Sequence, residues 1–132
     1  MKSEIVAAVL PRLLLRVGPD ECQEFIVEFP LPAVFEAEEK VGHPLTTLKD
    51  WLGLSPKDIP IVLEAGMRKH HSDAAAEAVK IVCANMTPEA LDEVHYALCK
   101  LSFPRVMDAI EQAKKAEAEG KVPKNGQSGD AR

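Results

Sequence analysis

The sequence predicts a mainly α fold: a bundle of about four to five short helices with a small N-terminal β-hairpin. Residues 12–29 alternate between apolar and polar side chains, whereas from residue 32 onward apolar residues recur at helical spacing. A length of 132 residues suits one domain. We expect a single helical domain over 1–119 and a disordered C-terminal tail over 120–132, which has little to bury.

The hairpin is expected over about 12–29, with "GPDEC" as its turn. Arginines mark the outer face of the first strand and glutamates that of the second, which is a favourable cross-strand pairing. Because a lone hairpin is only marginally stable, helices must cover its apolar side. The residues expected on that side are Leu13, Leu15, Val17, Phe25, Val27 and Phe29, with Glu24, Ile26 and Glu28 opposite.

Proline, glycine and capping residues divide the rest of the chain into helices. Pro32 is placed to open a helix that Gly42 ends, and a short helix "TLKDWLG" follows with Thr46 or Thr47 as its cap. The helix in 55–71 begins near Ser55 or Asp58. Its apolar stripe comprises Ile59, Val62, Leu63, Gly66 and Met67.

Three further boundaries are expected toward the C-terminus. Ser72 or Asp73 can cap the helix in 74–86, and "TPEALDEV" starts the next helix with Thr87 as its cap. The tripeptide "SFP" at 102–104 breaks that helix, and a last helix ends at Gly120.

Composition excludes several functional classes. The net charge is −5 with acidic and basic residues interleaved, which disfavours nucleic acid or an anionic membrane as partner. No apolar run is long enough to span a membrane. The three cysteines form no CxxC pair, which favours free thiols in a reducing compartment. We therefore expect a cytoplasmic protein.

The stretch "LEAGMRKHHSD" raises the question of a metal or acid–base site at His70, His71 and Asp73. Adjacent histidines on a helix point about 100° apart, and helical ligand pairs prefer a spacing of four. The simpler interpretation is the polar end of one helix followed by the start of the next, where cationic side chains are favoured by the helix dipole.

A second candidate site comprises His95 and Cys99, four residues apart, together with Cys83. These side chains allow a small metal-stabilised domain, although a closed site needs a fourth ligand that the sequence does not supply. Glu36, Glu38 and Glu39 have the pattern of a solvated helix face. Since no nucleotide-binding or nucleophile motif occurs, we predict no metal, no cofactor and no catalytic residue, and therefore no enzyme.

Residues 23–86 resemble the small tail assembly chaperones of long-tailed phages and gene transfer agents. Those proteins have a strand, then a helix of the form "L-x-x-L-E-x-x-x-G", then an "A-G-L-R-H-x-x-P-x-x-T-x-E-x-V" segment. The matching residues here are Phe35, Glu38 or Glu39, Gly42, Leu45, Ala65, Gly66, Met67, Arg68, His70 or His71, Asp73, Glu77 and Val79. Met67 stands where leucine is usual.

The resemblance implies a non-catalytic protein of the host cell cytoplasm that binds the tail tape-measure protein and helps recruit the tail-tube protein. It also implies that Gly66 allows close helix packing at a helix–turn–helix junction. The expected partner-binding residues are Ile59, Val62, Leu63 and Met67, wherever the chain's own core does not use them. Exposed apolar stripes also allow a homo-oligomer. A generic helical adaptor with a different partner is the alternative.

Overall fold

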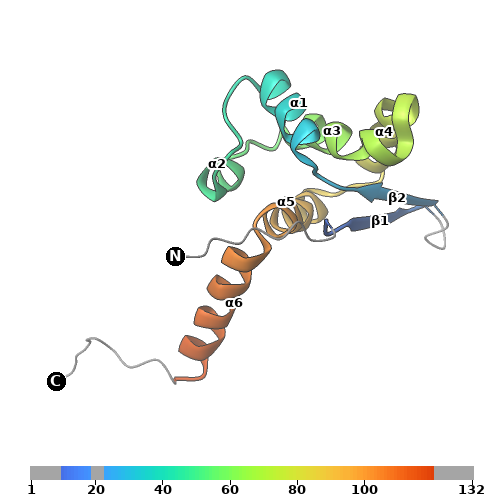
Figure 1. Ribbon diagram of the computed structural model, residues 1–132. Coiled ribbons are helices and arrows are strands. Elements are labelled where there is room, and N and C mark those ends of the chain that lie inside the picture. The colour runs from blue at the N-terminus through green and yellow to red at the C-terminus, as the bar shows by residue number, and fades with distance from the viewer. Residues whose placement is uncertain (1–9, 19–22, 121–132) are drawn as a thin grey trace. The chain divides into compact units, whose positions relative to one another are not determined.

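A computed structural model describes residues 10–18 and 23–120 and divides the chain after Ser102 into two units (Figure 1). The described elements of the first unit are β1 (Leu13–Val17), β2 (Gln23–Val27), α1 (Leu31–Val41), α2 (Leu48–Leu52), α3 (Ile59–His71), a 3₁₀ turn (Ser72–Ala74), α4 (Ala75–Ala84) and α5 (Pro88–Ser102). The second unit contains α6 (Pro104–Ala118). The predicted mainly helical fold with an N-terminal hairpin is confirmed. Within the described ranges, no helix combines the length and apolarity that crossing a membrane requires.

The boundary between the two units lies at the predicted "SFP" break. Phe103 has φ −135° and ψ 63°, outside the helical region. Pro104 causes this, because its ring disfavours helical geometry at the preceding residue and it has no N–H to donate. The expectation of one domain over 1–119 stays a prediction, and α6 is described here as a unit of its own. The predicted tail after Gly120 lies outside the described residues.

The hairpin pairs β1 with β2 in antiparallel register, with Leu13 opposite Val27 and Leu15 opposite Phe25. The predicted cross-strand ion pair is present, because Arg16 Nε lies 2.9 Å from Glu24 Oε2. Phe25 and Val27 are buried, as expected for the face that helices cover. The turn predicted around residues 19–22 lies outside the described part of the chain.

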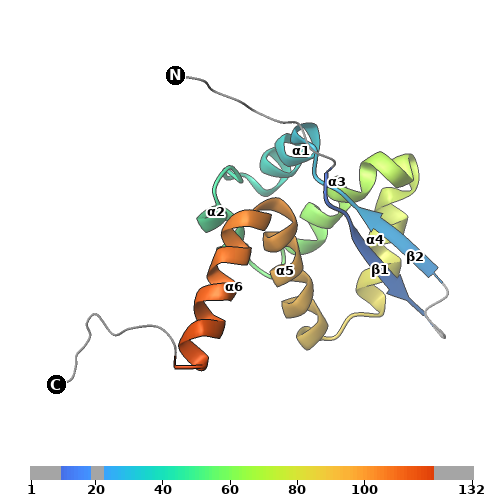
Figure 2. The ribbon, with the colours of Figure 1, turned by 60° about the horizontal axis from the view of Figure 1, so that its bottom comes forward.

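Helix α3 lies at the centre of the first unit, where it contacts α1, α4 and β2 (Figure 2). The main-chain N–H of Glu28 donates to the carbonyl oxygen of Gly66 at 2.8 Å. A Cβ atom at Gly66 would lie 2.5 Å from Phe29 Cζ and 2.7 Å from Val27 Cγ1. The structure thus has a close approach at Gly66, but the neighbours are Val27 of β2 and Phe29 just after it, rather than another helix as the resemblance implied.

Three of the predicted helix boundaries are formed by the expected capping residues. Gly42 ends α1 in the left-handed region with φ 83°. Thr47 and Asp50 form a reciprocal capping box at α2, and the hydrogen bonds from Thr47 lower the pKa of Asp50. Thr87 Oγ1 accepts from the N–H of Ala90 at 3.1 Å in the first turn of α5. These bonds satisfy main-chain groups that helix ends leave unpaired.

The start of α4 differs from the prediction. A 3₁₀ turn precedes the helix, its N-cap position is Ala74, and no side chain caps it. Ser72 has φ 47° and ψ −124°, so its main chain does not have the extended conformation of a capping serine. Ser72 instead ends α3, where its N–H donates to the carbonyl oxygen of Arg68.

Candidate partner-binding groove

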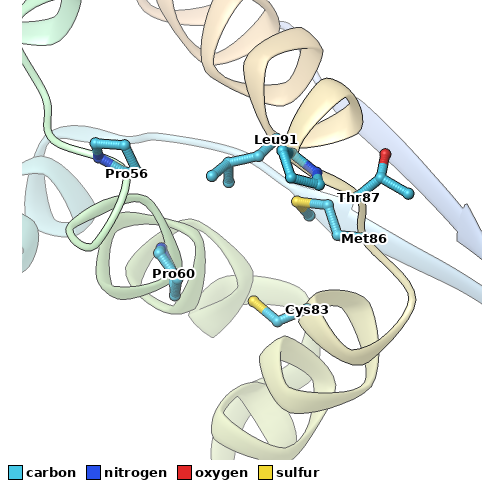
Figure 3. A pocket seen from close by; sticks show the side chains of 7 residues that line it. Pro56, Pro60, Cys83, Met86, Thr87 and Leu91 are labelled. Atoms are coloured by element: carbon cyan, nitrogen blue, oxygen red, sulfur yellow. The ribbon is translucent and has the colours of Figure 1, made fainter.

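An apolar groove runs along one side of α5 within the first unit. Its first part has a volume of about 280 Å³ and lies between the start of α3, the end of α4 and the start of α5 (Figure 3). Its second part, of about 240 Å³, continues along α5 as far as His95. Pro56, Pro88 and Leu91 line both parts. The remaining lining residues are Pro60, Cys83, Met86 and Thr87 in the first part and Leu54, Ile59, Asp92 and His95 in the second.

Local sequence explains how the two walls of the groove are built. On α5, Pro88, Leu91, Asp92 and His95 have the i, i+3, i+4, i+7 spacing that places side chains on one helix face. His95 Nε2 lies 2.7 Å from the carbonyl oxygen of Trp51, which fastens this face of α5 to α2. On the other wall, Pro60 occupies the first turn of α3, where a missing N–H has no consequence.

The groove has the chemistry of a binding surface for apolar groups. In Figure 3, the proline rings of Pro56 and Pro60 lie across the pocket from Leu91, Met86 and Cys83. Burial raises the pKa of the Cys83 thiol, so this cysteine is a poor nucleophile at neutral pH. The mainly apolar lining of the groove suits the apolar side chains of another polypeptide.

The predicted partner-binding stripe lies in the core instead. Ile59 is 2% exposed, and Val62, Leu63 and Met67 are 0% exposed. The chain's own core thus uses all four residues, and only Ile59 reaches the groove lining. Periodicity correctly indicates the apolar face of α3 but does not indicate what covers it. Here α1, α4 and β2 cover it.

The two adjacent histidines fasten the end of α3 to the hairpin. His70 Nε2 lies 2.6 Å from Glu28 Oε1, and His71 Nε2 accepts from the main-chain N–H of Ile26 at 2.9 Å. The His71 ring also packs edge-on against Phe25, with ring centroids 5.5 Å apart. Asp73 is exposed in the 3₁₀ turn. The two imidazoles thus contact different groups of one segment, in β2 and directly after it.

Neither metal-site candidate assembles in the part of the chain that the structure describes, where no three His, Cys, Asp or Glu side chains gather closely enough to hold an ion. The His95 side chain is hydrogen-bonded to the carbonyl oxygen of Trp51, and Cys83 lines the groove. Cys99 is buried, which raises the pKa of its thiol.

The acidic residues of α1 also have structural partners. Glu36 Oε2 lies 2.7 Å from Arg68 Nη2, and this hydrogen bond is the main reason that the pKa of Glu36 is lowered. Glu38 Oε2 accepts from the N–H of Leu45 at 2.8 Å. Only Glu39 has the exposed position that the sequence indicated for all three.

The environment of Glu28 differs from the one that strand alternation predicts. This residue is expected on the outer face of the hairpin, yet its side chain is 3% exposed. Lys69 Nζ lies 3.2 Å from it and Arg12 Nε 3.9 Å, in addition to His70. The His70 hydrogen bond is the largest cause of the lowered pKa of Glu28. Strand alternation could not place this residue, because β2 ends at Val27.

Comparisons with models of protein families, with curated proteins and with solved structures give no match to this chain.

Proposed function

We propose that the chain is a non-catalytic phage or prophage tail assembly chaperone, which binds the tape-measure protein during tail morphogenesis and helps recruit tail-tube subunits. The observation that carries this proposal is the apolar groove along α5. A groove between helices that is lined by proline, leucine and methionine side chains is a recurring way to hold a partner helix.

The resemblance and the groove involve the same part of the chain. One wall of the groove, formed by residues 54–60 with Cys83 and Met86, lies inside the segment that resembles tail assembly chaperones. A chaperone for a long helical protein has to cover apolar side chains that would otherwise be exposed to water. The groove offers apolar surface of the matching kind.

The contacts of the titratable side chains favour a binding role over a catalytic one. Glu28 and Glu36, whose pKa values are lowered, both lie in ion pairs that hold α3 against the hairpin and α1. The side chains of His71 and His95 form hydrogen bonds with main-chain atoms of Ile26 and Trp51. A catalytic site needs such groups to converge on a pocket, whereas these groups join elements of the fold.

The proposal is tested by co-expressing the chain with the proteins encoded immediately downstream, followed by pull-down and mass spectrometry. We expect capture of a long helical protein that is insoluble when expressed alone. The variant Leu91→Ser removes an apolar side chain shared by both parts of the groove and should abolish capture. The control Leu52→Ser alters a leucine of α2 that is 52% exposed and does not line the groove, and it should leave capture intact.

Two results would contradict the proposal. Capture of only a short globular protein would favour a generic adaptor, and equal capture by Leu91→Ser and the parent chain would move the binding surface away from the groove. Far-UV circular dichroism of both variants establishes that the helices are retained.

A further inference from the structure

The geometry points to a basic amphipathic helix as the occupant of the groove along α5. This inference rests on the proposed function insofar as the groove is taken as the partner-binding surface. It goes beyond that function by assigning the occupant its secondary structure and the sign of its charge.

The shape of the groove favours a helix. The α5 wall runs from Pro88 to His95, which at 1.5 Å per residue is about 10 Å, or two helical turns. Two turns of a partner helix present apolar anchors at positions i, i+3 or i+4, and i+7. An added β-strand would instead need a row of open main-chain groups, and side chains of helices and of the 54–60 segment line this groove.

The charges beside the groove favour a basic partner. Glu89, Asp92 and Glu93 have the i, i+3, i+4 spacing that places them on one side of α5, and all three are exposed. Asp92 lines the groove itself. Within residues 10–18 and 23–120, none of the three acids is in an ion pair. Their carboxylates are therefore available to a cationic partner.

The opposite rim has charged residues of both signs, because Asp58 follows Lys57 and lies 3.7 Å from His43. Lys57 is exposed beside Pro56, at the wall formed by the 54–60 segment. A helix in the groove would accordingly place its basic residues toward α5 and a neutral or acidic residue toward Lys57. The net charge of −5 for the whole chain adds a long-range attraction for a basic partner.

A second copy of the chain fits this surface less well. Two copies that met through their grooves would bring the acidic rims of α5 together, and juxtaposed like charges disfavour association. A basic helix from another protein has no such penalty.

The test uses three synthetic peptides of about 15 residues, near the length at which isolated helices become stable. The first combines leucine anchors at helical spacing with flanking lysine and arginine, the second keeps the anchors but has glutamate flanks, and the third keeps the basic flanks with glutamine in place of leucine. Fluorescence anisotropy with the full chain measures the Kd of each peptide. We expect the first to bind at least tenfold more tightly than the second, roughly the effect of 1.4 kcal/mol, and the third not to bind.

A charge-reversal variant distinguishes two sources of attraction for the basic peptide: the three acidic residues of α5 beside the groove, and the net negative charge of the whole chain. The triple variant Glu89→Lys, Asp92→Lys, Glu93→Lys should invert the preference, so that the glutamate-flanked peptide binds more tightly. The control Glu39→Lys, Glu77→Lys reverses two exposed acids of α1 and α4 that do not line the groove, and it should keep the original order. Added salt should weaken binding of the basic peptide.

The outcomes separate this inference from the proposed function. Equal binding of the basic and acidic peptides, or an unchanged order in the triple variant, would overturn the charge assignment. No binding of either leucine peptide would overturn the helical occupant. Neither result would affect capture of a tape-measure protein in the pull-down, which tests the proposed function separately.

Discussion

The carbonyl oxygen of Gly66 accepts the main-chain N–H of Glu28 at 2.8 Å, so the chain leaving β2 touches the backbone of α3 in the middle of that helix. This contact requires a residue without a side chain at the point of approach. It brings Glu28 and Ile26 within reach of the two histidines at the end of the same helix.

Replacement of Gly66 by alanine should destabilise the fold. The added Cβ would lie 2.5 Å from Phe29 Cζ, and overpacking of this kind costs about 1–3 kcal/mol. The better helix propensity of alanine offsets up to about 1 kcal/mol of this loss. Urea unfolding measures the difference. Gly53→Ala is the matched control, because a Cβ there meets its nearest atom at 3.4 Å and φ is −87°. An equal effect of the two substitutions would contradict the close approach at Gly66.

Glu28→Gln should make the stability of the protein less dependent on pH in the acid range. The pKa of Glu28 is lowered from its ordinary value of 4.5, chiefly by the His70 hydrogen bond. A carboxyl group with a lowered pKa in the folded state stabilises the protein above the unfolded-state value, and this stabilisation is lost as pH falls through the folded-state value. The free energy of unfolding of the parent chain should therefore fall below about pH 4.5 more steeply than that of the variant.

The control for Glu28 is Glu24→Gln, which removes a carboxylate that is 51% exposed and paired with Arg16. Exposed pairs contribute at most about 1 kcal/mol. At neutral pH, Glu28→Gln should lower the free energy of unfolding by about 1–3 kcal/mol, because it weakens charge-assisted hydrogen bonds at a buried site. Parallel pH profiles for Glu28→Gln and the parent chain would show that Glu28 is not ionised in this network.

His71→Ala should destabilise the hairpin contact by about 1–3 kcal/mol, since it leaves the N–H of Ile26 without its acceptor. Thermal unfolding followed by circular dichroism measures this loss. His43→Ala is the control, because that imidazole is 41% exposed and its contacts are with Pro44 and Asp58 at the surface. A similar small effect of both substitutions would argue that water replaces the imidazole at Ile26.

Ser72→Gly should leave the stability unchanged or raise it by up to about 1 kcal/mol. Ser72 has φ 47°, a conformation that costs non-glycine residues about 1–3 kcal/mol. Glycine removes this strain but adds chain entropy to the unfolded state. Ser72→Ala keeps a Cβ in the same conformation and should give no gain. A clear loss of stability in Ser72→Gly under urea unfolding would contradict the strain at this position.

Local signals predicted the secondary structure well. Thr47, Gly42 and Thr87 act at helix ends as their chemistry requires, and the alternation in 12–29 corresponds to two paired strands. Each of these signals depends on neighbours within a few residues. Ser72 differs from its local signal, because it ends α3 with φ 47° instead of capping α4.

The candidate site was predictable only in part. Leu91 and His95 follow from periodicity as residues of one α5 face, but the groove also needs Pro56 and Pro60 from another element. Periodicity predicts a partner-binding stripe at Val62 and Met67, since it cannot distinguish a face that the core covers from one that stays open. The burial of Glu28 depends on His70, which is 42 residues away.

The two histidine bonds also bear on the kinetics of folding. His70 and His71 join α3 to residues 42 and 45 positions earlier, and the chain between them contains α1 and α2. Closing so long a loop has an entropic cost that precedes the gain from its contacts, which slows folding. We therefore expect this closure to set the refolding rate, so that His71→Ala slows refolding in stopped-flow experiments more than it accelerates unfolding.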